Sequence, residues 1–272
     1  MKDKKNLASI WKLVEPPIRP SNGVMAIYKK YLLQQKSKGA KNFLLLGATP
    51  EIRSLVNHES CSLLCVDRNK EMFSGLEELV THKGRNTFIC SDWLDIKTNS
   101  PIDIVFGDGV VNMLPHDKQE QLIQVIHKVL APQCMTMLRT TTISKPMFES
   151  AQKLFEWYRT SQQYQPVFTT TNIHLRMLWL HETQTKTLDY VEYYNYLHQL
   201  HQQGTMRDEE FSCYQKLYQT KDKLNVYYPK KDDFEQLLSK YFEIENISYG
   251  NDYSGNEYNP VYVLTKRVAA PN

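Results

Sequence analysis

The chain has 272 residues, 41% of them hydrophobic, and carries 33 basic and 30 acidic side chains with a formal net charge of +3. This length and composition predict a globular protein built as one large domain or two of roughly 100–150 residues. The small, interspersed charge argues against nucleic acid as a partner, because phosphate binding needs concentrated Lys and Arg.

The sequence also predicts the surroundings of the protein. No apolar run approaches the roughly 20 residues of a membrane span, so we expect no membrane contact. The cysteines show no close spacing of metal-ligand type, and we interpret them as reduced thiols in a cytoplasmic protein. The oligomeric state does not follow from the sequence. These cysteines are Cys61, Cys65, Cys90, Cys134 and Cys213.

Residues 1–41 predict an N-terminal helical segment. Ser21 is a favourable N-cap residue, and the apolar residues after it recur at helical spacing as far as Tyr31.

Residues 42–140 alternate short apolar runs with helical patterns, which is typical of a βαβ series. Continuous apolar runs suit parallel strands that helices cover on both faces. We therefore expect a Rossmann-like, doubly wound α/β sheet. The runs are FLLLG, SLLCVD, TFICSD, IDIVFGD and CMTMLR.

Residues 141–238 show no clear strand run and hold ten of the seventeen tyrosines. Helix-like stretches around 147–158, 187–202 and 207–219 predict a helical insertion after the fifth strand, which we expect to cover the substrate.

Two strand-like runs, YFEIENISYG and NPVYVLTK, follow the insertion. They complete a mostly parallel seven-stranded sheet with an antiparallel edge strand. Residues 42–140 and 239–272 would then form one ligand-binding domain, with 141–238 as its insertion.

The turn after the first predicted strand reads LLLGATPE. Gly47 permits a tight turn, Thr49 is a plausible N-cap, Pro50 fits the first helical position and Glu51 suits the helix dipole. These roles are structural, but ligands of open α/β sheets bind at this carboxyl edge.

An acidic residue ends each of the next three strands. Asp67 comes 20 residues after Gly47, where a carboxylate accepts hydrogen bonds from the hydroxyls of a ribose. Asp92 precedes Trp93, so an acceptor for an adenine amino group stands beside a ring that can cover the base. Asp108 lies between glycines. Each acid alone could simply begin a helix or turn, but together they indicate an adenosine site.

On these residues the sequence resembles the class I S-adenosylmethionine-dependent methyltransferases. The resemblance implies that S-adenosylmethionine is the cofactor, with its methionine part at the first turn, its ribose after the second strand and its adenine after the third. The turn after the fourth strand would face the methyl group and the substrate. The implied cofactor-binding residues are Gly47, Ala48, Thr49, Asp67, Arg68, Asp92, Trp93, Asp108, Gly109 and Asn112.

The first turn departs from the family pattern, because Leu45, Thr49 and Glu51 replace an acidic residue and two glycines. The form Gly-x-Thr-Pro-Glu resembles one bacterial branch of the family, as does RPSNGVMAIY at residues 19–28. Arg19 and Tyr28 are candidate substrate residues that approach the site from the N-terminal segment, although the same helix could simply pack on the sheet.

The chemistry implied is methyl transfer to oxygen or nitrogen of a small-molecule acceptor. Asp108 and His116 are candidate bases, although His116 could merely begin a helix. Tyr193 and Tyr194 are candidate walls of the acceptor pocket, and we expect no metal.

Two alternatives stay open. An aminopropyltransferase-like enzyme would need an additional acidic pocket for a diamine, and a non-catalytic S-adenosylmethionine-binding protein would lack an acceptor pocket. A dinucleotide oxidoreductase is disfavoured, since the first turn lacks G-x-G-x-x-G.

Overall fold

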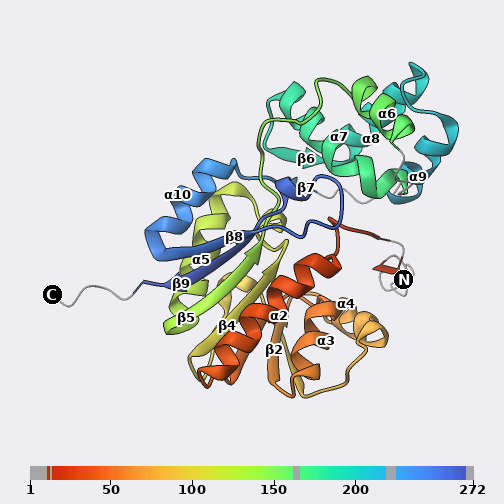
Figure 1. Cartoon of the computed structure of the whole chain (residues 1–272). Helices are drawn as coiled ribbons and strands as arrows, with labels where there is room; N and C mark the ends of the chain where they lie inside the picture. Colours follow the sequence, from red (N-terminus) through yellow and green to blue (C-terminus); the bar gives the residue numbers. More distant parts are fainter. Residues whose placement is uncertain (1–10, 13, 162–165, 219–224, 268–272) are drawn as a thin grey trace.

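A seven-stranded sheet organises the main body of the protein (Figure 1). The computed structural model describes residues 11–12, 14–161, 166–218 and 225–267. The strands are β1 (Asn42–Leu46), β2 (Ser62–Asp67), β3 (Asn86–Cys90), β4 (Ile102–Asp108), β5 (Leu130–Arg139), β8 (Phe242–Ser248) and β9 (Val261–Lys266).

The strand order is β3-β2-β1-β4-β5-β9-β8. Strands β1 to β5 pair in parallel, whereas β9 is antiparallel to both of its neighbours, β5 and β8. The antiparallel strand thus lies one place in from the edge that β8 forms. This arrangement confirms the predicted fold class, a doubly wound and mostly parallel sheet closed by a pair of late strands.

Helices cover both faces of this sheet. On one face, α2 buries Val24, Tyr28 and Leu32, which recur every four residues and so share one side of the helix. Ser21 caps α2 by accepting from the Val24 N–H at 3.2 Å. None of the helices in the described ranges is long and apolar enough to cross a membrane. The covering helices are α2 (Asn22–Ser37) and α3 (Pro50–His58) on one face, and α5 (His116–Val129) and α10 (Lys231–Tyr241) on the other.

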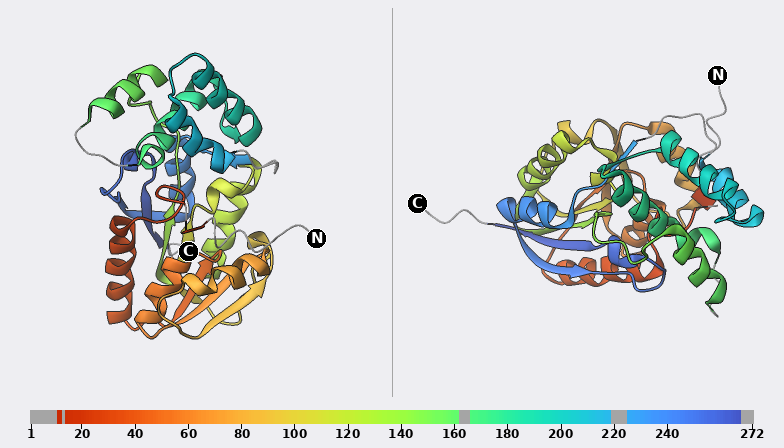
Figure 2. Two further views of the ribbon diagram at one scale, coloured as in Figure 1. Left: turned by 90° about the vertical axis from the view of Figure 1, so that its right-hand side faces the viewer. Right: turned by 90° about the horizontal axis from the view of Figure 1, so that it is seen from above.

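A second body of helices, which we call the cover, stands between β5 and α10 in the sequence. It has its own apolar core, and Figure 2 shows it gathered at one end of the molecule. The helical insertion predicted after the fifth strand is therefore present. Its elements are α6 (Ala151–Thr160), α7 (Val167–Thr183), β6 (Thr187–Asp189), α8 (Tyr190–Gln202), α9 (Asp208–Tyr218) and β7 (Asn225–Tyr227).

Sequence patterns missed one helix and two short strands of this region. Helix α7 is buried on every side from Val167 to Leu180, so it has no polar face to reveal the helical period. The strands β6 and β7 have only three residues each, too few for an alternating pattern. Helix α10 begins inside the predicted insertion, ends beyond it and packs with α5 on the sheet. The domain boundaries themselves stay a prediction.

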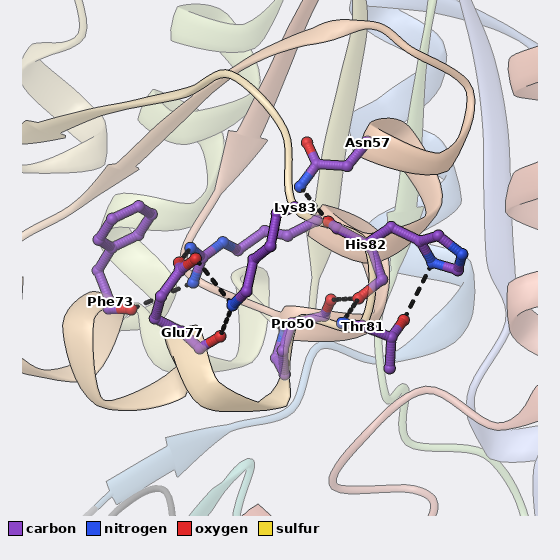
Figure 3. Close-up of polar contacts among 9 residues, drawn as sticks. Pro50, Asn57, Phe73, Glu77, Thr81, His82 and Lys83 are labelled. Carbon is purple, nitrogen blue, oxygen red and sulfur yellow. Dashed lines mark hydrogen bonds and ion pairs between the residues drawn. The ribbon is translucent and has the colours of Figure 1, made fainter.

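A buried arginine, Arg53 of α3, ties this helix to the segment after β2, whose Phe73 and Glu77 are drawn in Figure 3. Its guanidinium donates to the Phe73 carbonyl at 3.1 Å, pairs with the Glu77 carboxylate and lies 4.0 Å from the centroid of the Phe73 ring. Lys83, more exposed, reaches the Glu77 carbonyl at 2.6 Å. Because this segment follows directly on Asp67, the contacts fix the end of β2 against α3.

We expect Arg53→Ala to lower the free energy of unfolding by roughly 2–4 kcal/mol, because it empties a buried site and leaves the Phe73 carbonyl without its donor. Lys83→Ala removes an exposed partner of the same Glu77 and should cost less than about 1 kcal/mol. Urea unfolding of both variants measures the difference. Equal losses would show that Arg53 contributes no more than a surface ion pair.

Candidate functional site

The turn after β1 brings three predicted residues together. Gly47 has φ +102°, and a Cβ at this position would stand 3.8 Å from Oδ2 of Asp67 and 4.0 Å from Cζ2 of Trp93. Gly47 therefore suits the turn through its positive φ, and its missing side chain leaves space beside the carboxylate and the indole. This space lies at the carboxyl edge of the sheet, where ligands of such folds bind.

The start of α3 closes one side of this turn. Pro50 occupies the first turn of the helix as expected, but Thr49, at the N-cap position, makes no side-chain capping hydrogen bond. Glu51 accepts from Trp11 Nε1 at 3.1 Å and pairs with Arg19 at 2.6 Å through Oε1. Its other oxygen, Oε2, is buried and has no hydrogen-bond partner among the described residues.

Residues 11–12 and 14–20, which we call the lid, thus reach the turn through Trp11 and Arg19. Trp11 packs against Ala48 and Leu76, and Arg19 reaches the Glu51 carboxylate. The structure places the predicted residues Arg19 and Ala48 beside Gly47. The sequence assigned Glu51 only a dipole role, and its position in the first turn of the helix gave no sign of its partners.

Asp67 is half-buried at the end of β2. Its Oδ1 accepts from the Asn69 N–H at 2.7 Å, while Oδ2 lies toward the Gly47 turn. Burial raises the pKa of Asp67 above its ordinary value, and the Asn69 N–H opposes that shift. Asn69 itself caps the short helix α4 (Lys70–Gly75). A carboxylate that has been partly stripped of water and keeps one oxygen toward the cleft is suited to accept hydroxyl donors.

Asp92 and Trp93 lie at the end of β3, beside Asp67. Asp92 accepts from the Leu94 N–H at 2.9 Å through Oδ1, and Oδ2 lies 3.4 Å from a guanidinium nitrogen of Arg68. Trp93 Nε1 donates to the Val66 carbonyl at 2.7 Å, which anchors the ring on β2. Of these residues, Trp93 reaches the space next to Gly47, while Asp92, its neighbour in sequence, pairs with Arg68.

Asp108 is engaged in a buried ion pair. Arg139 donates to its two oxygens at 2.5 and 2.9 Å, and the Tyr28 hydroxyl donates to Oδ1 at 3.1 Å. Arg139 also donates to the Pro17 carbonyl of the lid at 2.6 Å. Burial alone would lower the pKa of Arg139, but the Asp108 carboxylate raises it above its ordinary value. Burial, followed by the Asp108 charge, raises the pKa of Tyr28.

This geometry argues against two of the sequence predictions. With both oxygens of Asp108 bonded to a guanidinium, neither is free to take a proton from an acceptor. Tyr28 is fully buried and faces Asp108, so it does not offer a wall to a substrate. Arg139 was missed, although it ends β5 directly opposite Asp108 in the parallel register. The signal that could have revealed Arg139 is its position as a charged residue at the end of the apolar run CMTMLR.

The segment after Asp108 contacts the cover and its stem. Gly109 has φ +72° with open space where a Cβ would stand. The amide of Asn112 donates to the carbonyls of Thr141 and Tyr227 at 2.8 and 2.9 Å, and its oxygen accepts from the Thr141 N–H at 2.9 Å. Because these bonds use most of its capacity, Asn112 is better placed to fasten the cover than to bind a ligand.

His116 lies where α5 begins, beside the cover. Its Nε2 is 3.2 Å from the Lys186 carbonyl, and its ring meets the Tyr227 ring edge-on with centroids 5.6 Å apart. Since a carbonyl can only accept, Nε2 carries the proton in a neutral ring and Nδ1 is the basic nitrogen. His116 therefore keeps one nitrogen that could accept a proton.

The two predicted pocket tyrosines lie inside the cover. Tyr193 is fully buried and packs edge-on against Trp179 with centroids 5.8 Å apart. Tyr194 is partly buried and lies beside Phe211. Neither borders the space near Gly47, because the period of α8 turns Tyr193 toward the core of the cover.

A hollow of about 480 Å³ lies between the lid, the start of α7 and the loop before β9. Arg19 borders it from the lid, Pro166 and Thr169 from the cover, and Asp252 and Tyr253 from the loop. Burial raises the pKa of Tyr253 to about 12, and the nearby Arg139 charge opposes that shift. Because Tyr253 lines the hollow and lies near Arg139, the hollow adjoins the Asp108–Arg139 pair. In the described part of the chain, no group of three or more His, Cys, Asp or Glu could hold a metal ion.

No protein-family model and no curated protein matches the sequence. Solved structures share its fold. An S-adenosylmethionine-dependent methyltransferase from Clostridium acetobutylicum matches with a TM-score of 0.57 and 10% identity over 97% of this chain and 98% of its own. A second match is the 1,6-didemethyltoxoflavin-N1-methyltransferase of Burkholderia thailandensis, solved with 1,6-didemethyltoxoflavin and S-adenosylhomocysteine bound. Its TM-score is 0.51 and its identity 9%, over 95% of this chain and 81% of its own.

A Rhodobacter sphaeroides protein described among the Zn-dependent alcohol dehydrogenases matches equally well, with a TM-score of 0.57 and 12% identity over 98% of this chain and 100% of its own. Similarity at these identities establishes the fold, and the predicted resemblance to class I methyltransferases holds at that level. The chemistry has to be argued from the residues of the site.

We expect Arg139→Leu to cost roughly 3–5 kcal/mol of unfolding free energy, because it strands the buried Asp108 carboxylate without its counter-charge. Lys240→Leu, at the exposed pair with Glu120, should cost less than about 1 kcal/mol. Urea unfolding compares them. A stability of Arg139→Leu close to the parent's would mean that Asp108 does not depend on this pair, and would return it to the candidate bases.

Proposed function

We propose that this chain, whose fold is that of the class I methyltransferases, binds S-adenosylmethionine beside Gly47 and methylates a small-molecule acceptor. One observation carries the proposal: Gly47, the Asp67 carboxylate and the Trp93 ring converge on one space at the carboxyl edge of the sheet. A glycine cradle, a carboxylate and an aromatic wall in this order along the sheet fit an adenosine ligand.

The residues around this space match the parts of the cofactor. Asp67 would accept from the ribose hydroxyls, and Asp92 with Trp93 would bind the adenine. At the methionine end, Arg19 would pair with the carboxylate and the unpartnered Oε2 of Glu51 would accept from the ammonium group. The bound cofactor supplies the electrophilic methyl group, so the chain has to hold and orient the reactants.

The hollow beside the lid supports a small acceptor. Its volume suits a molecule of modest size, and it adjoins the Arg19 side of the proposed cofactor site. The Burkholderia enzyme of the same fold binds a small heteroaromatic molecule together with S-adenosylhomocysteine. Of the two predicted bases, only His116 keeps a basic atom, Nδ1, without a partner in the described part of the chain, but His116 does not border the hollow. Both O- and N-methylation fit.

The alternatives fit less well. An aminopropyltransferase needs an acidic diamine pocket, but the hollow mixes Glu15 and Asp252 with Lys12 and Arg19. A zinc-dependent or dinucleotide-dependent dehydrogenase would need metal ligands or G-x-G-x-x-G at the first turn. That turn reads Gly-Ala-Thr-Pro-Glu-Ile, and the described residues hold no cluster of metal ligands.

Calorimetry should detect binding of both S-adenosylmethionine and S-adenosylhomocysteine. Asp67→Asn should weaken binding about tenfold or more, since charge-assisted bonds to hydroxyls each contribute ~1.5–3 kcal/mol. Asp95→Asn removes an exposed acid three residues after Asp92 and should leave affinity unchanged. The proposal fails if neither compound binds the parent, and the ribose assignment fails if both variants behave alike.

Affinity for S-adenosylhomocysteine should also fall on acidification. Hydroxyl donors need the ionised Asp67, and burial raises its pKa above the ordinary value of 3.8, so protonation begins at a higher pH than for an exposed Asp. Affinity should therefore be full near neutral pH and fall as the pH approaches that raised pKa. Calorimetric titrations from about pH 7.5 down to about pH 4, close to the ordinary carboxylate pKa, test this. A parallel fall in Asp67→Asn would place the titrating group elsewhere.

A further inference from the structure

The cover encloses an arginine without an acidic partner. Arg176 of α7 keeps only 6% of its surface exposed. Its Nε donates to the Tyr218 hydroxyl at 3.0 Å, Nη2 donates to the same hydroxyl, and Nη1 donates to the Tyr228 hydroxyl at 2.9 Å. No carboxylate pairs with it within residues 14–161, 166–218 and 225–267.

Other shielded arginines of the chain do have such a partner. Arg53 pairs with Glu77, Arg139 with Asp108 and Arg159, also in the cover, with Glu210 at 2.6 Å. A guanidinium cannot lose its proton at physiological pH, so its burial without a counter-charge costs several kcal/mol. Arg176 therefore departs from the rule that the rest of the molecule follows.

The surroundings of Arg176 are rich in unused hydrogen-bond donors. The guanidinium has five N–H groups, and its bonds to the two tyrosine hydroxyls leave some of them free. Asn172 accepts from the Tyr218 hydroxyl at 3.0 Å, yet its fully buried Nδ2 has no partner in the described structure. Tyr193, whose ring packs edge-on against Tyr218, also has an unpartnered hydroxyl. The cluster thus lacks an acceptor, and an oxyanion would provide one.

Helix α7 links this cluster to the hollow beside the lid. Thr169, Asn172 and Arg176 are spaced by three and four residues, so they share one face of the helix. Thr169 borders the hollow, and its buried Oγ1 has no partner in the described structure. Seven residues of helix span about 10 Å. A polar stripe therefore runs from the hollow toward the guanidinium.

We propose that Arg176, Asn172 and the surrounding tyrosine hydroxyls form a binding site for a carboxylate carried by the methyl acceptor. The planar guanidinium fork matches a carboxylate, and the tyrosine rings suit an aromatic or aliphatic body. The site itself is independent of the cofactor. The assignment of its ligand as the acceptor rests on the proposed function.

Matched probes test the site. Binding of 3-(4-hydroxyphenyl)propanoate is compared with that of its neutral amide by calorimetry and by thermal shift, with inorganic phosphate as a further arm. We expect the carboxylate to bind at least about tenfold more tightly than the amide does, and at least about tenfold more tightly than phosphate does. Equal binding of acid and amide would overturn the proposal, and equal binding of phosphate would leave a free-anion site and overturn the acceptor assignment.

Two substitutions separate binding from folding. Arg176→Lys keeps the charge without the fork and should weaken carboxylate binding about tenfold, while Arg159→Lys, at the arginine that has an acid partner, should not. Arg176→Met should abolish the preference for the acid and leave the unliganded protein at least as stable as the parent, since it removes an uncompensated charge. A marked drop in the melting temperature of unliganded Arg176→Met would overturn the proposal.

Cofactor calorimetry keeps the two proposals distinguishable. S-adenosylhomocysteine should bind Arg176→Met as it binds the parent, because Arg176 lies in the cover and not beside Gly47. If the parent binds the carboxylate but not S-adenosylhomocysteine, the proposed function fails and the anion site stands. If it binds S-adenosylhomocysteine but no carboxylate, the site fails alone.

Discussion

The buried ion pair of Asp108 and Arg139 holds the carboxyl edge of the sheet together. It joins the ends of β4 and β5, receives the Tyr28 hydroxyl from α2 and holds the lid through the Pro17 carbonyl. A charge pair so deep is retained at a cost in desolvation, and its several hydrogen bonds offset that cost. The hollow beside Tyr253 depends on segments that this pair positions.

Local patterns were sufficient for the sheet and for the grouping of Gly47, Asp67 and Trp93 at its carboxyl edge. Strand runs and strand-end residues follow from the chain's own periodicity, so Gly47, Asp67 and Trp93 could be grouped from the sequence alone. Arg139 and Arg176 could not be assigned in this way. Their roles depend on which residues stand opposite them in space, and one has an acid partner while the other is bonded to tyrosine hydroxyls.

Helix α7 of the cover also holds residues whose roles depend on their partners in space. A helix buried on every side is usually apolar, but α7 carries Thr169, Asn172, His174 and Arg176 in its buried stretch. His174 illustrates the effect of that burial, which lowers its pKa to about 4 and keeps the ring neutral. A core made only for stability would avoid such groups, since each needs a partner that packing alone does not supply.

The fastening of the cover has a consequence for how ligands enter and leave. Asn112 ties the loop after β4 to both Thr141 and Tyr227, and the Lys231 and Ile143 backbones bond across the two connections between cover and sheet. The cover is therefore anchored at both of its stems. The lid is held in part by surface ion pairs, such as Lys12 with Glu78, which dissolved salt screens. A ligand that enters past the lid should therefore do so faster as the ionic strength rises.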